Sequence, residues 1–369
     1  MVYCPLLWLR STLHVALWGA LPPGEPVFRG ARVGIDVGTT AVRVCVKGRG
    51  VILREPTVVA LDKATGTPRA VGRAALQLLG EAPGDVIPVR PLQDGLITEE
   101  ALLEEVLREV LRRLVSAPRR LLRGALGPSV ALCLPAAATP AQTRAALATV
   151  QDGGARAVEL VDPPLAAALG AGLPVTEAAG CFVADLGGGS TDLAVIALGG
   201  VVVGETLRVA GGTFDEAVVR AVRRHHGVLI GERSGEELKR RIGSVSSEAE
   251  KAAADETLEV RGRDVARGLP KTVTVSRAEV GEALQEGAAR LASAVRRLLE
   301  TAPAELTADI VRSGLVLTGG GSYLRGLDSY LQTHTGLPVT RAPSAEDCTA
   351  VGALRALSCP EPLRAAPRT

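Results

Sequence analysis

The chain has 369 residues, which is longer than one compact core usually supports and suits about two domains. Its 42 basic and 40 acidic residues leave a net charge of +2, so composition gives no support for nucleic-acid binding. Aromatic residues make up 2% of the chain although 47% of it is hydrophobic. The core must therefore be built from valine, leucine, isoleucine and alanine.

The first 30 residues form an N-terminal extension (1–30) that contains both tryptophans. Arg10 and His14 interrupt its apolar run, which is therefore shorter than the ~20 residues that a membrane span needs. No basic segment precedes the run, so we expect no signal peptide. An interfacial membrane anchor, a poorly ordered tail and an upstream start that the cell does not use remain open.

The six cysteines are scattered and form no CxxC or cysteine–histidine ligand pattern. Four of them lie in apolar stretches, where cysteine behaves as a small hydrophobic residue. We therefore expect reduced thiols, a cytoplasmic protein and no thiolate-bound metal.

From residue 32 onward, strand and helix patterns alternate. The segment from residue 32 predicts two strands joined by a tight turn at 38–40, and leucines and valines at spacings of three and four predict a helix over 99–115. A strand, a glycine turn and a strand occur near residue 36 and again near residue 187, which indicates a duplicated α/β layout. Further strands are expected at 129–135 and 158–161, and further helices at 139–150, 163–173, 212–227 and 280–300.

Three glycine turns are the candidates for a ligand-binding site: DVGTT (36–40), DLGGGST (185–191) and TGGGS (318–322). A single turn of this kind is most simply a hairpin turn, since glycine adopts positive φ freely. Backbone N–H groups of glycine turns also wrap anions, and two opposed turns can hold a phosphate chain. Asp36 and Asp185 would repel phosphate unless a cation lies between, and Mg²⁺ binds through one or two carboxylates plus phosphate oxygens. The chain has neither a Walker A loop nor a Rossmann GxGxxG motif.

Several longer motifs identify a family. GIDVGTT, VRPLQDGLIT, DLGGGSTDLAVIALGG, GERSGEELK, GLPKT, PAELTADI and VLTGGGSYLRGLD resemble the actin-like ATPase superfamily and, within it, the bacterial MreB and Mbl family. The resemblance covers about residues 32–356. It implies an α/β actin-like ATPase fold of two duplicated ribonuclease-H-like domains, each with a smaller subdomain, and a nucleotide in the cleft between them. The implied boundaries are domain I at 31–155 with a small subdomain near 53–95, domain II at 156–334 with a small subdomain near 212–275, a C-terminal return to domain I at 335–357, and a loose tail at 358–369.

The resemblance also implies the site. Asp36 and Asp185 would order the waters of Mg²⁺ and, with Gln142, form the catalytic set of a weak ATPase that uses ATP or GTP. The implied nucleotide contacts are Gly38, Thr39, Thr40, Ala41 and Arg43 at the first turn, Gly187, Gly188 and Gly189 at the second, Glu236, Glu237, Leu238 and Lys239 in GEELK, and Gly319, Gly320, Gly321 and Ser322 at the third.

Departures from the family pattern concern hydrolysis more than binding. Ala41 stands where the family usually has asparagine, and Arg43 where it usually has an apolar residue. Arg43 supplies charge near the phosphates or is a solvated strand residue. Gln142 replaces the family's water-orienting glutamate; glutamine orients water but accepts no proton as a base. Pro163 replaces a second carboxylate beside Asp162.

The family resemblance also implies partners. It predicts self-assembly into filaments, a peripheral position at the inner face of the cytoplasmic membrane, and contacts with cell-wall synthesis and rod-complex membrane proteins, without nucleic acid. The membrane loop would be the segment 117–129, a role that its position favours over the alternative of a helix that continues to Gly124 with an ordinary basic face. In this loop leucines would insert and arginines would face anionic lipid, namely Arg119, Arg120, Leu121, Leu122, Arg123 and Leu126.

The sequence can be compared with four functions. A cytoskeletal ATPase that organises cell-wall synthesis and sets cell shape fits the motifs best. An ATP-binding paralogue that acts as a scaffold with little hydrolysis is favoured by Ala41, Gln142 and Pro163. A small-molecule kinase on the same fold, or a chaperone, would usually have a longer chain with a substrate pocket or a peptide-binding domain.

Overall fold

The computed structural model describes residues 30–81, 84–114, 127–245, 256–359 and 363. The extension up to residue 29 and the predicted membrane residues Arg119, Arg120, Leu121, Leu122, Arg123 and Leu126 lie outside the described residues. The predictions made for them therefore stay predictions.

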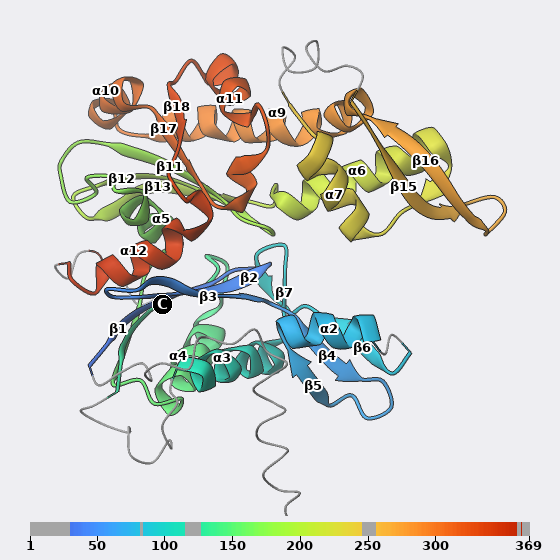
Figure 1. Ribbon diagram of the computed structural model, residues 1–369. Helices are drawn as coiled ribbons and strands as arrows, with labels where there is room; N and C mark the ends of the chain where they lie inside the picture. The colour runs from blue at the N-terminus through green and yellow to red at the C-terminus, as the bar shows by residue number, and fades with distance from the viewer. Residues whose placement is uncertain (1–29, 82–83, 115–126, 246–255, 360–362, 364–369) are drawn as a thin grey trace, which may run out of the picture.

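The first half of the molecule is built on a five-stranded sheet of order β10-β9-β1-β2-β3 (Figure 1). The meander β1-β2-β3 is antiparallel, whereas β9 and β10 continue the sheet in parallel. Leucines and valines of the amphipathic helix α3 share one hydrophobic cluster with the strands. The elements are β1 (Arg32–Val37), β2 (Ala41–Val46), β3 (Gly50–Pro56), β9 (Ser129–Cys133), β10 (Ala157–Leu160), α3 (Glu100–Leu114) and α4 (Pro140–Asp152).

The second half repeats this plan with the sheet β13-β12-β11-β17-β18. An antiparallel meander again carries two parallel strands, β17 and β18, on the side of its first strand. β11 and β12 are almost continuously apolar because both faces of the sheet are covered. The elements are β11 (Cys181–Leu186), β12 (Thr191–Ala197), β13 (Gly200–Leu207), β17 (Leu315–Thr318), β18 (Val339–Arg341), α9 (Arg277–Thr301), α10 (Ala304–Ser313), α11 (Leu327–Thr335) and the 3₁₀ turn η1 (Gly320–Tyr323).

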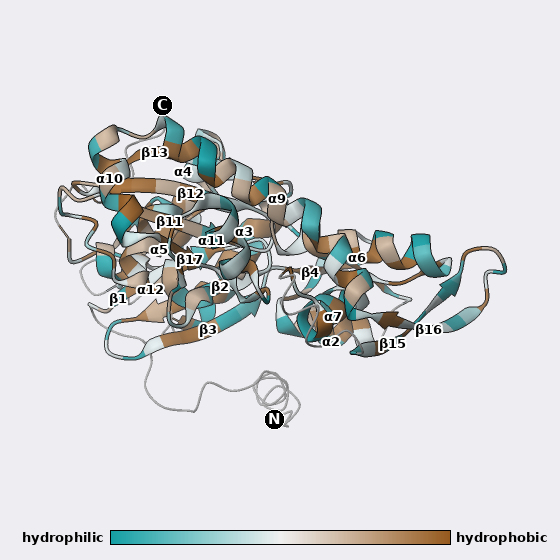
Figure 2. Cartoon of the chain, turned by 90° about the horizontal axis from the view of Figure 1, so that it is seen from above, coloured by the Kyte–Doolittle hydropathy of each residue, from teal (hydrophilic) through white to brown (hydrophobic). Residues whose placement is uncertain are grey.

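Hydrophobic residues follow the strands of the two sheets, and α9 alternates between hydrophobic and hydrophilic faces (Figure 2). A capping box formed by Ser276 and Glu279 starts α9. The identical strand order of the two sheets confirms the duplicated α/β layout expected from the sequence.

Two helices, α5 (Pro163–Ala171) and α12 (Cys348–Ala356), pack together between the two sheets (Figure 1). Their backbones approach closely at two glycines. A Cβ atom on Gly352 would collide with the carbonyl oxygen of Ala166, and one on Gly170 would collide with that of Cys348. Small residues at this crossing therefore hold the two halves together.

Each half also carries a smaller part at one end (Figure 1). The first contains β4 (Val59–Asp62), β5 (Pro68–Val71), α2 (Arg73–Glu81) and β6 (Val86–Val89), followed by the short hairpin β7 (Leu92–Gln93) and β8 (Leu96–Ile97). The second contains α6 (Gly211–His226), β14 (Val228–Leu229), α7 (Glu232–Ile242), β15 (Thr257–Asp264) and β16 (Pro270–Ser276).

The domain boundaries and the tail need correction. Strand β10 belongs to the first sheet, so a boundary at 155 cuts that sheet. Strand β18 pairs with the second sheet, although it lies within the segment 335–357 that the resemblance implies for domain I. The segment 358–369 is not loose where it is described: Leu363 is buried, and Ser358 accepts a hydrogen bond from Arg32. Apart from these boundaries, the domain division remains a proposal.

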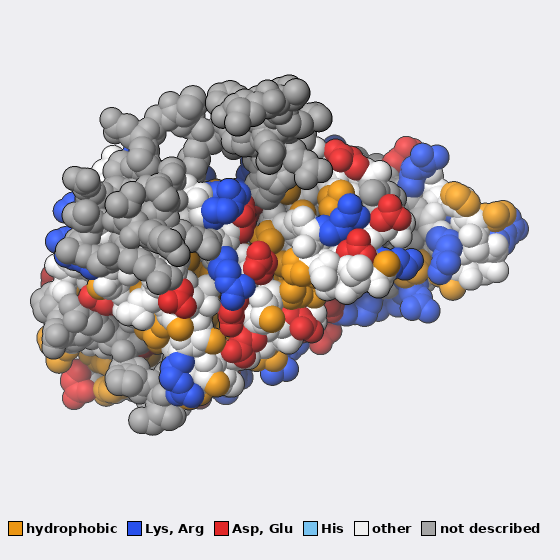
Figure 3. Space-filling view, turned by 90° about the horizontal axis from the view of Figure 1, so that it is seen from below, with side chains coloured by type: hydrophobic (Ala, Val, Ile, Leu, Met, Phe, Trp, Pro, Cys, Tyr) orange, Lys and Arg blue, Asp and Glu red, His pale blue; other side chains and the backbone are white. Residues whose placement is uncertain are grey.

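The described surface mixes acidic and basic side chains (Figure 3). Hydrophobic side chains appear at the tip of the projecting β15–β16 hairpin, where Val265 and Leu269 are exposed. Among the described helices, none combines the length and apolar character that a membrane span requires. The five described cysteines are free thiols: Cys45, Cys133, Cys181, Cys348 and Cys359.

Candidate functional site

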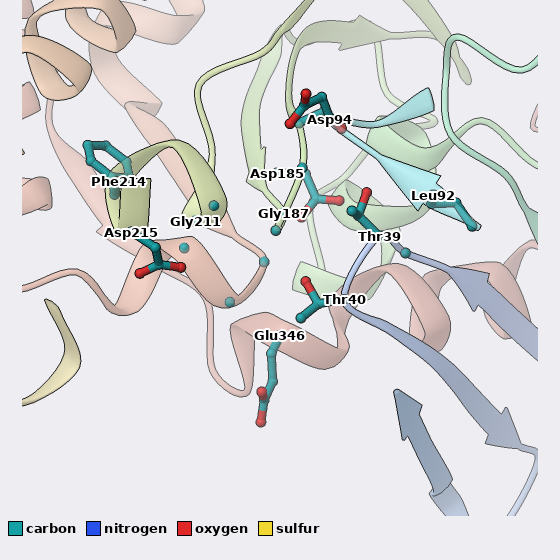
Figure 4. Close-up of a pocket in the computed structure, with 18 of the residues that line it drawn as sticks. Thr39, Thr40, Leu92, Asp94, Asp185, Gly187, Gly211, Phe214, Asp215 and Glu346 are labelled. Carbon is teal, nitrogen blue, oxygen red and sulfur yellow. The ribbon is translucent and has the colours of Figure 1, made fainter. Parts of the chain in front are cut away.

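A cavity of about 1160 Å³ lies between the two halves. Thr39 and Thr40 of the first glycine turn lie beside Asp185 and Gly187 of the second half, and Asp215 reaches the cavity from α6 (Figure 4). All three predicted glycine turns line it, with Gly38, Thr39, Thr40, Gly187, Gly188, Gly189, Gly319, Gly320 and Gly321.

The first two turns oppose each other in direct contact. A Cβ atom on Gly188 would collide with Oγ1 of Thr40, and one on Gly189 would lie 2.5 Å from Oγ1 of Thr39. Each turn also closes on itself: Gly38 N donates to the carbonyl of Ala41 at 3.2 Å, and Gly187 N donates to that of Ser190 at 2.9 Å. Bare backbone is therefore required where the two halves meet.

The third glycine turn, at 318–322, packs against the second, at 185–191. Gly319 has φ of +77°, and a Cβ atom there would lie 2.7 Å from Oδ1 of Asp185. Only glycine combines that backbone conformation with that proximity. The turn therefore places its backbone directly against the Asp185 carboxylate.

Asp185 is partly buried and is oriented by two hydroxyl groups. Thr349 donates to Oδ2 at 2.9 Å and Thr318 donates to Oδ1 at 3.0 Å. Burial raises the pKa of Asp185, while the two hydroxyls and Arg43 oppose that rise. The carboxylate is thus held in one orientation at the cavity wall.

Asp36 is the last residue but one of β1, as Asp185 is of β11. Burial raises the pKa of Asp36 to about 7; Arg43, whose Nη1 lies 3.7 Å from Oδ2, lowers it, and Asp185 and Asp192 raise it further. Two partly buried carboxylates at one cavity favour a bound cation.

The far end of the cavity is formed by α6 and α7. Lys239 pairs with Asp215 at 2.8 Å and donates to the carbonyl of Gly211 at 3.0 Å. Burial raises the pKa of Asp215 to about 6, against the lowering effect of Lys239. Glu236 of the GEELK motif lines the same end.

Five predicted residues do not line the cavity. Leu238 is fully buried in the core, and Glu237 pairs on the surface with Arg241, because a helix turns adjacent residues to different faces. Ser322 is buried and closes η1 by donating to the carbonyl of Gly319 at 2.7 Å. Ala41 is the first residue of β2 and does not line the cavity.

Gln142 is the fifth. It is the third residue of α4 and completes a capping box with Thr139. Its Oε1 accepts from Thr139 N at 3.0 Å, and its Nε2 donates to the carbonyl of Ile97 at 3.0 Å. Because Gln142 does not line the cavity, its side chain must move before it can orient a water molecule there.

Sequence reasoning missed other cavity residues. Asp215, Thr349 and Glu346 line the cavity, and so does Asp94 at the tip of the β7–β8 hairpin. Asp94 and Gly95 have positive φ, and a Cβ atom on Gly95 would lie 2.8 Å from Oγ of Ser190. The dipeptide Asp-Gly is a recognisable hairpin signal, whereas Thr349 has no local signature.

The described residues fit a nucleotide with Mg²⁺. No described group of three or more His, Cys, Asp or Glu side chains is arranged to hold a metal by itself. Two carboxylates beside glycine turns suit Mg²⁺, which keeps several waters and completes its shell with phosphate oxygens. Glycine backbone at 187–189 lines the cavity together with Thr39 and Thr40, whose hydroxyls contact Gly189 and Gly188.

Comparison with solved structures defines the class of fold. MreB 5 of Spiroplasma citri bound to AMPPNP superposes with a TM-score of 0.79 at 31% identity, covering 88% of this chain and 94% of that one. The same protein bound to ADP gives a TM-score of 0.78 at 30% identity. A MamK double helical filament, with a TM-score of 0.71 at 22% identity over 89% of this chain and 98% of that one, shares the fold. The chain thus has an actin-like fold.

Sequence comparison gives the family. The model of the MreB/Mbl protein family matches residues 30–364. Cell shape-determining protein MreB of Escherichia coli is 43% identical over 332 residues, which cover 88% of this chain and 92% of that protein. Cell shape-determining protein Mbl of Bacillus subtilis is 38% identical over 325 residues, covering 87% and 93%. The chain belongs to the MreB/Mbl family.

Proposed function

We propose that this chain is a cytoskeletal ATPase, which binds ATP or GTP with Mg²⁺ in the cavity between its halves and assembles into filaments that determine cell shape. The observation that carries the proposal is the pair of opposed glycine turns, each preceded by a partly buried aspartate, Asp36 and Asp185. Relatives named cell shape-determining proteins, and a neighbour bound to ADP and AMPPNP, support it.

Residues at different places in the cavity would bind different parts of the nucleotide. Backbone N–H groups at 38–40 and 187–189 would hold the phosphate chain from opposite sides. Glu236, Lys239 and Asp215 stand at the far end of the cavity, with polar groups suited to the nucleoside. The turn at 38–40 belongs to the first half and the turn at 187–189 to the second. A bound nucleotide would therefore draw the two halves together.

Asp36 and Asp185 would hold water molecules of Mg²⁺, which when bound neutralises phosphate charge. Thr318 and Thr349 keep the Asp185 carboxylate aimed at the cavity and prevent it from rotating. Gln142 does not line the cavity, so it would orient the attacking water only after its side chain moves, and as an amide it accepts no proton. We therefore expect slow hydrolysis.

The hydrogen bonding of Gln142 favours a second candidate function. Both polar atoms of the Gln142 side chain are hydrogen-bonded, one in the helix cap and the other to Ile97. If Gln142 stays in this position, the chain would bind ATP and form filaments as a scaffold that rarely hydrolyses its nucleotide. Filament sedimentation, with phosphate release followed in the same sample, separates the two candidates. Sedimentation with slow release supports the ATPase, and sedimentation without release supports the scaffold.

Asp185→Ala tests the site itself. We expect this variant to lose Mg²⁺-dependent nucleotide turnover, while Asp264→Ala, at the base of the β15–β16 turn, behaves as the parent. Turnover at the parental rate in Asp185→Ala would show that the site is misplaced. Nucleotide binding without sedimentation would reopen the small-molecule kinase.

The position of the protein in the cell is a further part of the proposal. We infer that it lies at the inner face of the cytoplasmic membrane and contacts cell-wall synthesis and rod-complex membrane proteins, as the family resemblance implies. The double variant Leu121→Ser and Leu122→Ser should weaken cosedimentation with anionic liposomes. Unchanged binding would instead point to residues 1–30.

A further inference from the structure

Three charged residues stand in a row across the first sheet. The strand register places Asp36 of β1 opposite Arg43 of β2, and Arg43 opposite Arg54 of β3. Residues directly opposite each other in antiparallel strands project from the same face. Asp347 of η2 (Ala345–Asp347) joins the row from a distant part of the chain, accepting from Arg54 Nε at 2.9 Å and Nη2 at 2.5 Å.

Arg43 is surrounded by opposite charge but is poorly hydrogen-bonded. Its Nη1, Nε and Nη2 lie 3.7 Å from Asp36, 3.9 Å from Asp347 and 4.0 Å from Glu346. These separations exceed hydrogen-bond length. The buried Nε has no hydrogen-bond partner among the described residues. A guanidinium held by charge alone keeps its donors available for a ligand.

The guanidinium lies beneath the first glycine turn. Arg43 lines the cavity, and a Cβ atom on Gly38 would lie 3.9 Å from its Nη1. Because Arg54 engages both oxygens of Asp347, that carboxylate does not need Arg43 as its counter-ion. The charge of Arg43 is therefore directed towards Asp36 and the cavity.

We propose that Arg43 is a fixed cation of the phosphate site, which supplies part of the positive charge otherwise provided by the divalent metal. This inference rests on the proposed nucleotide binding. Without a metal, a bare Asp36 would repel phosphate oxygens, but Arg43 already balances it. The chain consequently holds its nucleotide with a weaker dependence on Mg²⁺ than it would with an apolar residue at position 43.

The test is the ratio of the nucleotide dissociation constant in excess EDTA to that in Mg²⁺, measured with ATP by calorimetry. Arg43→Leu should raise this ratio by about tenfold, the effect of about 1.4 kcal/mol. Arg43→Lys keeps the charge but loses the planar fork, and should leave the ratio within about twofold of the parent.

A ratio that does not change in Arg43→Leu would overturn the proposal, as would Arg43→Lys behaving like Arg43→Leu. If Arg43→Leu does not fold, the half-exposed Arg54 gives a second route. In Arg54→Leu, Asp347 loses its partner and draws Arg43 away from Asp36, so the ratio should again rise; an unchanged ratio there also overturns the proposal. A parent chain that binds no ATP even with Mg²⁺ refutes the proposed function instead.

Discussion

The hydroxyl of Thr349 donates a hydrogen bond of 2.9 Å to Oδ2 of Asp185, although 164 positions separate the two residues. Thr349 belongs to α12, which packs between the halves, and Asp185 is the last residue but one of the central strand β11. The C-terminal helix therefore takes part in orienting the carboxylate that we propose to hold Mg²⁺.

Thr349→Val tests that orientation. Valine matches the shape of threonine but leaves Oδ2 of the partly buried Asp185 without this donor. A hydrogen bond to a charged group contributes about 1.5–3 kcal/mol, so we expect nucleotide affinity in Mg²⁺ to fall by about ten- to a hundredfold. Calorimetric titration gives the affinity, and Thr349→Ser, which keeps the hydroxyl, should stay close to the parent. If Thr349→Val binds nucleotide with the affinity of the parent, α12 does not contribute to nucleotide binding.

Gln142→Glu tests the source of slow hydrolysis. Glutamate also completes a capping box, so α4 should keep its stability, while its carboxylate is repelled by the carbonyl of Ile97 and can accept a proton. We expect phosphate release to increase by about 10²-fold. Gln142→Ala is the control, because it loses the cap and should lower the melting temperature. No gain in phosphate release would mean that residue 142 does not reach the attacking water.

Gly352→Ala tests the crossing of α5 and α12. The added Cβ meets the backbone of Ala166, which cannot move aside as a flexible side chain would. We expect a loss of about 1–3 kcal/mol in the free energy of unfolding, measured with urea. Gly80→Ala, in α2, is a matched control with nothing within 4 Å of the new Cβ, and helix propensity predicts a gain of about 0.5–1 kcal/mol there. Equal effects in the two variants would argue against a tight crossing.

Asp215→Asn tests the burial of the charge at the far end of the cavity. The pKa of Asp215 rises from 3.8 to about 6 on folding, so the folded state holds the proton more tightly. Ionisation therefore costs stability as pH rises through this interval. We expect the stability of the parent relative to Asp215→Asn to decrease between pH 4.5 and 7.5 in urea unfolding.

Asp264→Asn is the control for that series. Hydrogen bonds from Arg267 and Ala266 lower the pKa of Asp264 below 3.8, so its titration lies below the measured interval. The stability difference between the parent and Asp264→Asn should stay constant from pH 4.5 to 7.5. A constant difference for Asp215→Asn as well would mean that its charge is fully compensated by Lys239.

Local patterns were sufficient for the glycine turns. Asp36 and Asp185 each follow an apolar strand and precede glycines, and this spacing by itself predicts strand, turn and strand. It also predicted the duplicated layout, because the same pattern occurs twice. These features depend on residues close together in the chain, where backbone geometry and side-chain alternation act directly.

Tertiary structure decided which other polar residues reach the cavity. Glu236 and Lys239 face it, whereas Glu237 and Leu238 point elsewhere, because the rotation of α7 about its axis is set by packing. Thr349 reaches Asp185 only because α12 crosses α5 at bare glycines. The amino-acid sequence by itself determined the strands, the turns and the family. Long-range packing determined the partners of each carboxylate, since those partners are distant in the chain and carry no local signature.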